Sequence, residues 1–337
     1  MNSASEYPRL SVVVNNYNYA NFLAEALESA IKQLSEVDEI IIVDDGSTDE
    51  SPDILRHYEK DRGIKLIEQQ NQGQMCAVRT GIEAAQGDIV VLLDSDDYFL
   101  DGYLQRLREL YAGDESISFV FSNAEIFGSD AAVIRRTRDN LDMRELPAGE
   151  MGVTRWAATR FHEYAGSATS GNSLRRPLAA QLMSLPASLD TTIALSPVIV
   201  RLLGISKTEA RKSGHNADAV IVRGASVLGA KKYYVKSPGF AYRIHGANKF
   251  ASTSRLGRWY LRRIYRRDFS QAMRQHFSLR WRPTACELRE EILGRTFARS
   301  LRGKLPIRVR YFLLAIVSDG TIIERASAMK AAIGLTE

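Results

Sequence analysis

Hydrophobic and polar positions follow two alternating periods over residues 9–122, and this pattern predicts strands and helices in turn. Short apolar, β-branched runs are typical of buried parallel strands, and they occupy Ser11–Val14, Ile40–Val43, Ile64–Ile67, Ile89–Leu93 and 117–122. Apolar residues at helical spacing fill the intervals and predict helices over 22–34, 51–61, 74–86 and 101–112. We therefore expect an α/β fold with a mostly parallel central sheet and helices on both faces.

The pattern weakens after residue 125. Residues 125–165 mix charged and apolar positions without a clear period, whereas apolar spacing predicts a helix over 216–233. From residue 255 onward the apolar spacing is again helical, and this part of the chain is rich in arginine. We expect the α/β region to be followed by a C-terminal helical segment.

Polar side chains gather where three of the predicted strands end. The first strand is followed by NNYN (15–18), the second by DDGSTD (44–49) and the fourth by DSDD (94–97). In open parallel sheets, ligands bind outside the carboxyl ends of the strands. The polar clusters therefore lie where the sheet predicts a binding site.

The DSDD segment predicts a metal ion. It places three carboxylates within four residues, and charges so close are unfavourable unless a cation or hydrogen-bond donors compensate them. Helix capping would account for one of these aspartates but not for three. Oxygen ligands of this kind suit Mn²⁺ or Mg²⁺, so we expect one of these two cofactors.

Charge divides the chain into two unlike parts. The 337 residues hold 45 Lys and Arg against 40 Asp and Glu, a formal charge of +5. Residues 255–310 contain 16 Lys and Arg against 4 Asp and Glu, which leaves the rest of the chain at −7. A hydrophobic content of 45% excludes a disordered chain. The sequence therefore describes an acidic globular body followed by a strongly basic segment.

Cysteine usage and the first residues bear on location. Cys76 and Cys286 have no Cys or His at metal-ligand spacing, so two buried free thiols in a reducing compartment are favoured over a zinc site or a disulfide. Residues 1–10 lack the features of a signal peptide, and no run of about 18 apolar residues could span a bilayer. We expect a cytoplasmic protein, with contact to the inner face of the plasma membrane left open.

Five segments together resemble the family 2 glycosyltransferases, which use nucleotide-sugar donors and have the GT-A type fold. The matching segments are SVVVNNYNYANFLAEALESAIKQ (11–33), EIIIVDDGSTDES (39–51), NQGQMCAVRTGIEAAQGDIVVLLDSDD (71–97), ATSGNSLRR (168–176) and ADAVIVRGASVLGAKKYYVKSPGFAYRIHGAN (217–248). The resemblance implies a catalytic domain over 1–250, followed by a basic helical region over 251–337. Within that domain, it implies a nucleotide-sugar half over about 1–122 and an acceptor half over about 123–250.

The resemblance also implies which residues bind the donor. Asn15 and Tyr17 match residues that hold the nucleobase, the tyrosine by stacking. Asp45, with Asp44 beside it, matches the carboxylate that hydrogen-bonds the base. Asp94 matches the first aspartate of the family's DxD motif, which contacts the ribose or sugar of the donor.

The remaining implied ligands concern the metal and the diphosphate. Asp96 matches the metal-binding aspartate of the DxD motif, and His245 matches a histidine that faces the diphosphate or the metal. Arg243 lies two positions before His245, so we expect it to contact phosphate as well. Arg79 replaces an asparagine that is common in the family, and it would meet a diphosphate or alter donor choice.

For the catalytic base, the resemblance implies Asp218, which would deprotonate an acceptor hydroxyl in a single inverting displacement. Many relatives have Glu before this Asp, whereas Asn216 and Ala217 precede it here. An aspartate at the start of a helix is also a common N-cap. Asp190 is the alternative base, and the sequence does not decide between the two.

Other functions explain the sequence less well. A dinucleotide oxidoreductase needs a glycine-rich turn after the first strand, but NNYNYA (15–20) contains no glycine. A nucleotidyltransferase would need a basic, glycine-rich phosphate loop near the N-terminus, and the sequence has none there. A nucleotide-sugar-binding scaffold without activity remains the main alternative to a transferase.

The basic segment suggests a further partner. In WYLRRIYRRDF (259–269), arginines flank aromatic residues, as in amphipathic helices that lie on anionic membranes. This composition would suit a transferase that acts on a lipid-linked acceptor. The resemblance to family 2 implies a UDP-sugar donor and a glycan or lipid-linked acceptor, in bacterial surface polysaccharide or glycolipid synthesis. Packing of residues 255–310 against the acidic body is the alternative. No nucleic-acid-binding module is present, so we expect no nucleic-acid partner.

Overall fold

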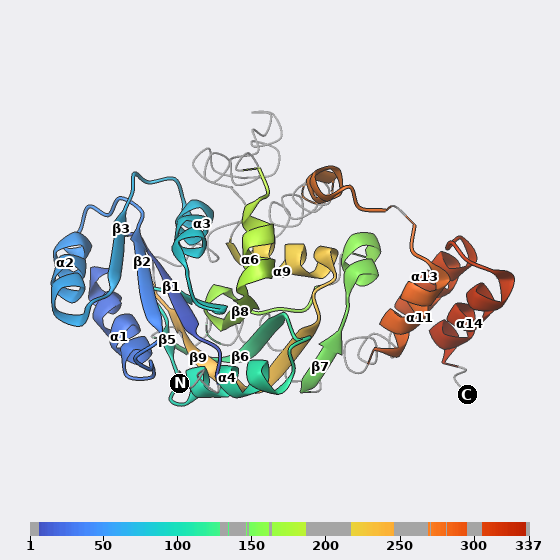
Figure 1. Cartoon of the computed structure of the whole chain (residues 1–337), viewed down its shortest axis with the longest axis horizontal. Helices are drawn as coiled ribbons and strands as arrows, with labels where there is room; N and C mark the ends of the chain where they lie inside the picture. Colours follow the sequence, from blue (N-terminus) through green and yellow to red (C-terminus); the bar gives the residue numbers. More distant parts are fainter. Residues whose placement is uncertain are drawn as a thin grey trace, which may run out of the picture.

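The fold was analysed in a computed structural model of the chain, shown in Figure 1. The structure describes residues 7–128, 134, 146, 148–161, 164–186, 217–245, 269, 271–280, 282–294 and 305–334. Its centre is one nine-stranded sheet with the strand order β3-β2-β1-β4-β8-β6-β9-β5, and β7 pairs with β9.

The first half of the sheet is parallel, as the sequence predicts. Its strands are β1 (Leu10–Asn16), β2 (Glu39–Asp44), β3 (Lys65–Glu68) and β4 (Ile89–Asp94). The accompanying helices are α1 (Ala20–Ile31), α2 (Ser51–Arg62), α3 (Gln74–Ala84) and α4 (Tyr103–Gly113). The predicted elements of residues 9–122 are confirmed, with small shifts at their ends.

The second half of the sheet is mixed. β8 (Asn172–Arg175) lies antiparallel between β4 and β6 (Phe119–Gly128). β9 (Lys232–Ile244) runs parallel to β6, while β5 (Tyr98–Phe99) and β7 (Gly149–Gly152) pair antiparallel with β9. Six of the nine described strands share one direction, so the expectation of a mostly parallel sheet is confirmed.

One predicted helix is too long. The sequence predicts a helix over 216–233, but α9 spans Ala217–Leu228 and β9 begins at Lys232. Gly229 follows the helix with φ = +81°, a left-handed conformation that glycine adopts without a steric penalty and that ends helices. The apolar residues after this glycine belong to the strand.

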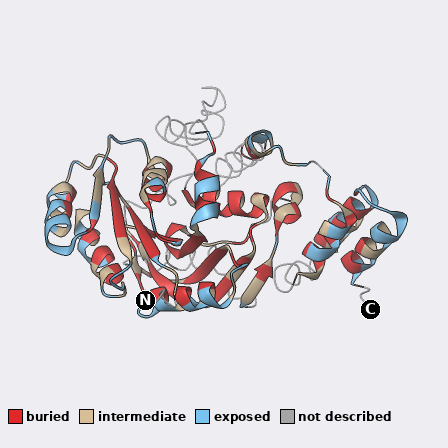
Figure 2. Cartoon of the chain, viewed as in Figure 1, coloured by how far each residue is buried: buried red, intermediate tan, exposed pale blue. Residues whose placement is uncertain are grey.

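Both faces of the sheet are covered by helices, as predicted (Figures 1 and 2). Side chains alternate along a strand, so Val12 and Val13 of β1 belong to different hydrophobic clusters. The cluster of Val12 includes residues of α1 and α4, and the cluster of Val13 includes residues of α3, α9 and α6 (Arg176–Met183). Most of the strand interior is buried in Figure 2. The carboxyl ends of β1, β2 and β4 therefore form one edge of a rigid platform.

The C-terminal helical segment is present, and its buried side chains belong to the same hydrophobic cluster as Val13. It includes α11 (Ala285–Leu293), α13 (Leu305–Ile316) and α14 (Ile322–Ile333). The Glu291 carboxylate, 4% exposed, accepts hydrogen bonds from the backbone N–H groups of Trp156 (2.9 Å) and Ala157 (2.6 Å) and from the Tyr311 hydroxyl (2.7 Å). Among the described helices, none combines the length and hydropathy needed to cross a membrane.

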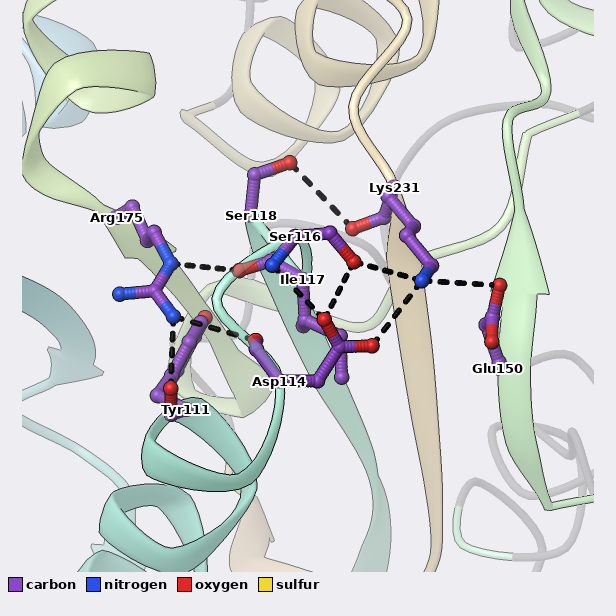
Figure 3. Close-up of polar contacts among 8 residues, drawn as sticks. All are labelled: Tyr111, Asp114, Ser116, Ile117, Ser118, Glu150, Arg175 and Lys231. Carbon is purple, nitrogen blue, oxygen red and sulfur yellow. Dashed lines mark hydrogen bonds and ion pairs between the residues drawn. The ribbon is translucent and has the colours of Figure 1, made fainter.

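A polar network stabilises the sheet at the edge opposite the predicted site (Figure 3). Lys231 Nζ, just before β9, lies 3.1 Å from Asp114 Oδ2 and 3.2 Å from Glu150 Oε1. Arg175 Nε donates to the carbonyl oxygen of Ile117 (2.8 Å). These contacts join the end of α4 to β7, β8 and β9, and hydrogen bonds from Ser116 and Lys231 lower the pKa of Asp114 to about 2.

Neither cysteine forms a disulfide, as expected, but they are not both buried. Cys76 on α3 is half-buried and Cys286 on α11 is exposed. The expectation of two buried thiols is therefore wrong for Cys286, because the amphipathic helix α11 turns this residue toward solvent while its neighbour Ala285 faces the core.

Candidate functional site

The aspartates that follow β4 form one cluster. Asp94 is the last residue of the strand, and Asp96 and Asp97 lie in the turn before β5. One carboxylate oxygen from each of the three lies within 4.8 Å of those from the other two. Because β4 is flanked by β1 and β8, the cluster occupies the middle of the sheet's carboxyl edge.

Each carboxylate of the cluster has different partners. Asp97 Oδ1 accepts from the backbone N–H of Arg243 (3.0 Å), and Asp97 Oδ2 accepts from the Ser170 hydroxyl (2.6 Å). Asp94 Oδ1 accepts from Gln74 Nε2 (2.8 Å). Both oxygens of Asp97 are thus engaged by protein donors, which leaves Asp94 and Asp96 better placed to bind a ligand.

Asp96 faces an imidazole. Its Oδ2 lies 3.0 Å from His245 Nε2, and the two side chains are 14% and 13% exposed. His245 directly follows β9, so the fold brings together two residues that are 149 positions apart. Tyr19 and Phe22 flank the imidazole, with ring centroids 5.4 and 4.9 Å from it.

Proximity and burial disfavour charge on the cluster. Burial raises the pKa of Asp94 to about 7, with the charge of Asp96 as the next cause, while hydrogen bonds from Gln74 and Asn15 oppose the shift. Burial also raises the pKa of Asp97 well above its usual range, again with contributions from Asp96 and Asp94. A divalent cation would remove this penalty, and oxygen ligands beside one imidazole fit Mn²⁺ or Mg²⁺.

The end of β1 adds polar and aromatic groups to the same edge. Asn15 hydrogen-bonds Asp94 through its side chain, while its buried Oδ1 has no hydrogen-bond partner. Tyr17 is 42% exposed, so its ring is accessible to a base. Both residues are therefore placed where a ligand can reach them. Their contact with a nucleobase stays a prediction.

The aspartates at the end of β2 are occupied by loop contacts. Asp44 and Asp45 are each 2% exposed. Asp44 accepts from Asn16 Nδ2 (2.7 Å), whereas Asp45 accepts from the backbone N–H groups of Gln72 (2.9 Å) and Gly73 (2.7 Å). Both residues thus shape the loops beside the site, and their contact with a base stays a prediction.

The two predicted phosphate ligands also contact protein groups. Arg79 Nη1 donates to the carbonyl oxygen of Met183, at the end of α6. Arg243 pairs with Glu25, and its guanidinium lies over the rings of Phe22 (4.7 Å) and Phe127 (4.6 Å). The sequence did not predict these contacts, and phosphate binding by either arginine stays a prediction.

Asp218 lies near the cluster. It is the second residue of α9, and its Oδ1 accepts from the backbone N–H of Ala219 (2.7 Å), the next residue of the helix. Its charge also contributes to the raised pKa of Asp94 and, after burial and the charges of the cluster, to that of Tyr242. Asp190, the alternative base, is outside the described residues.

The sequence does not single out several residues that lie near the cluster. Gln74 and Ser170 donate hydrogen bonds to the aspartates, and the charges of the aspartates contribute to the raised pKa of Tyr242. Gln74 and Ser170 lie within the matched segments NQGQM and ATSGN, but nothing in a single sequence distinguishes them from ordinary surface residues.

Comparisons with known proteins agree on one family. The model for glycosyl transferase family 2 matches residues 11–168. Glycosyltransferase alr2836 of Nostoc sp., described as uncharacterized, is 30% identical over 248 residues, which cover 73% of this chain and 68% of that protein. The putative glycosyltransferase EpsH of Bacillus subtilis is 42% identical over 112 residues, only 33% of this chain and 32% of EpsH.

A solved structure has the same fold. The crystal structure of S. aureus TarS 1–349 in complex with UDP-GlcNAc superposes with a TM-score of 0.52 at 14% identity. The match covers 96% of this chain and 79% of that one. The predicted GT-A type fold is therefore confirmed.

Proposed function

The chain belongs to glycosyl transferase family 2, and we propose that it transfers a sugar from a nucleoside-diphosphate donor to a hydroxyl acceptor with inversion. The observation that supports this proposal is the convergence of Asp94, Asp96 and His245 at the carboxyl edge of the sheet, with Asp218 nearby. We propose UDP as the nucleotide, a choice supported by the UDP-GlcNAc complex of TarS.

In this proposal, Asp96 and His245 hold Mn²⁺ or Mg²⁺. The bound ion would stabilise negative charge on the departing diphosphate. Asp94 binds the ribose or sugar of the donor, and Asp97 holds the turn through its bonds to Ser170 and Arg243. The raised pKa values of Asp94 and Asp97 support a site built to be neutralised by a cation.

The nucleobase lies against the end of β1 in this proposal. Tyr17 stacks on it, Asn15 offers a buried carbonyl oxygen, and Asp45 with Asp44 completes the base-binding edge. Arg79 and Arg243 remain proposed phosphate contacts. Asp218 acts as the base that removes a proton from the acceptor hydroxyl.

A donor screen tests the transferase proposal. UDP-, GDP- and dTDP-sugars would be incubated with the chain and Mn²⁺, and nucleoside diphosphate release and thermal stabilisation would be measured. We expect Asp96→Asn to abolish metal-dependent release. Asp101→Asn, which changes an exposed aspartate that pairs with Lys32 just after the same turn, should leave it unchanged. Donor binding without release would favour the scaffold instead, and release by Asp96→Asn would contradict the metal assignment.

We also propose that residues 255–310 meet an anionic membrane at the inner face of the plasma membrane, where a lipid-linked acceptor would lie. Their excess of 16 basic over 4 acidic residues supports this. Exposed aliphatic side chains just beyond this range would extend the same contact: Val317, after α13, is 56% exposed, and Ile322 and Ile323, the first residues of α14, are 86% and 81% exposed.

Vesicle binding tests the membrane contact. We expect the chain to sediment with phosphatidylglycerol vesicles and not with phosphatidylcholine vesicles, and to do so less after Ile322→Ser with Ile323→Ser. Val37→Ser, which removes an apolar side chain that is 51% exposed elsewhere, serves as the matched control. Equal sedimentation with both lipids, or no sedimentation, would contradict the proposal.

A further inference from the structure

Arg243, near the end of β9, touches the acidic turn at two points. Its backbone N–H donates to Asp97 Oδ1 (3.0 Å), and its Nε donates to the main-chain carbonyl oxygen of Asp96 (2.9 Å). We propose that Arg243 is a positioning residue that holds turn 94–97 in its metal-binding shape. The inference rests on the proposed metal site and assigns Arg243 a role beyond the predicted phosphate contact.

The guanidinium of Arg243 is itself fixed by α1 and β6. Its Nη2 pairs with Glu25, its Cζ lies over the rings of Phe22 and Phe127, and the side chain is only 16% exposed. A planar guanidinium can stack on rings through its faces while it donates hydrogen bonds from its edge, which a lysine ammonium cannot do. The group therefore has one well-defined position from which to hold the turn.

The contact with Asp96 matters because of where that residue's carboxylate points. Arg243 holds the carbonyl oxygen of Asp96, while Oδ2 of the same residue lies 3.0 Å from His245 Nε2. His245 follows Arg243 by two positions, so the end of β9 fixes both the main chain and the side chain of Asp96. The N–H of the peptide between Asp96 and Asp97 donates to the carbonyl oxygen of Asp94 (3.0 Å), so the Nε bond of Arg243 is a second hydrogen bond to the same peptide. Without the Nε bond, this peptide would be less firmly held and the Asp96 carboxylate would be able to shift away from its partners.

The two roles considered for Arg243 lead to different expectations in the absence of donor. A residue that only binds the phosphate of the donor should not affect Mn²⁺ binding, whereas a residue that positions the acidic turn should. Mn²⁺ binding to the nucleotide-free full chain would be measured by electron paramagnetic resonance of the unbound ion, together with kcat and the KM for the donor. For Arg243→Lys and Glu25→Gln we expect Mn²⁺ affinity to fall about tenfold, as is typical when an outer-shell partner is lost. We expect kcat to fall with it, while the donor KM at saturating Mn²⁺ changes little.

Glu28→Gln is the matched control for Glu25→Gln. Glu28 is one turn further along α1 and pairs with Arg62 (3.0 Å), so its removal breaks a similar ion pair away from the turn. Glu25→Gln also leaves Arg243 in place, which keeps the test valid if Arg243→Lys does not fold. A purely structural role would lower the melting temperature of each variant without changing its Mn²⁺ affinity.

The outcomes separate the two proposals. Unchanged Mn²⁺ affinity in both variants of the Arg243–Glu25 pair would overturn the positioning role, whether or not the donor KM rises. A wild-type chain that binds no Mn²⁺ would instead overturn the proposed metal site, and this inference with it. Weakened Mn²⁺ binding confined to the Arg243–Glu25 pair, with the Glu28 variant unchanged, would support the role.

Discussion

The buried carboxyl of Glu291 makes the folding stability depend on pH in a direction that can be calculated. Burial raises its pKa from 4.5 to about 7, although hydrogen bonds from Trp156, Tyr311 and Ala157 oppose the shift. Between these two values, the folded chain binds more protons than the unfolded chain. The free energy of unfolding therefore falls as the pH rises from about 4.5 to about 7.

The size of the effect follows from the shift. Each pKa unit corresponds to about 1.4 kcal/mol, so the change from 4.5 to about 7 corresponds to a loss of about 3 kcal/mol. Glu291→Gln isolates this contribution because glutamine has nearly the shape of the protonated acid and does not titrate. All other titrating groups cancel when the two chains are compared.

Urea unfolding at a series of pH values, followed by tryptophan fluorescence, would measure the difference. Trp156 donates its backbone N–H to Glu291, so its indole reports on this part of the structure. We expect the wild type to lose about 3 kcal/mol relative to Glu291→Gln as the pH rises from 4.5 through 7, with the loss levelling off once the pH has passed the folded pKa of about 7. A constant difference, or a wild type that gains relative stability with rising pH, would refute the reasoning. The second result would mean that the three donors outweigh burial and hold the pKa of Glu291 below its ordinary value.

Three further predictions concern the site and the platform beneath it. Mn²⁺ should raise the melting temperature more at pH 8 than at pH 5, because the pKa of Asp94 is raised to about 7 and the negative charge of this neighbouring carboxylate, which would favour the cation, is lost when it is protonated; an equal shift at both pH values would contradict this. Ser170→Ala removes the hydroxyl that donates to Asp97 and accepts from the Asp94 N–H, and we expect kcat to fall about tenfold with a small change in melting temperature. Unchanged kinetics would show that the turn does not need this bond. Gly81→Ala would place a Cβ 2.3 Å from Val13 Cγ1, where α3 crosses β1, and calorimetry should show a loss of about 1–3 kcal/mol; a neutral result would mean that the helix can move away.

Local patterns explain which elements could be predicted from the sequence. The parallel strands of residues 9–122 are continuous apolar runs flanked by helices, so their periods are visible in the sequence. In contrast, β5 and β8 have two and four residues, too few to show an alternation. The helical spacing predicted over 216–233 extends into the start of β9, because the first residues of this strand follow α9 after only a short turn at Gly229.

The same distinction applies to the candidate site. The sequence predicts the carboxylates of Asp94 and Asp96 because they lie two positions apart at the end of an apolar run that is typical of a buried strand. It does not predict that Gln74 holds Asp94 or that Ser170 holds Asp97, because those contacts depend on how α3 and β8 approach the sheet edge. Elements close together in space but far apart in sequence leave no local pattern.

The geometry of the acidic turn is therefore determined by the sheet as a whole. The end of β9 fixes Asp96 through Arg243 and His245, and the residues before β8 fix Asp97 through Ser170. Arg243 is in turn held by Glu25 of α1. Because β9 is parallel to β6 along its length, a change that alters the β6–β9 register would displace both Arg243 and His245. It should then weaken Mn²⁺ binding without altering any proposed metal ligand.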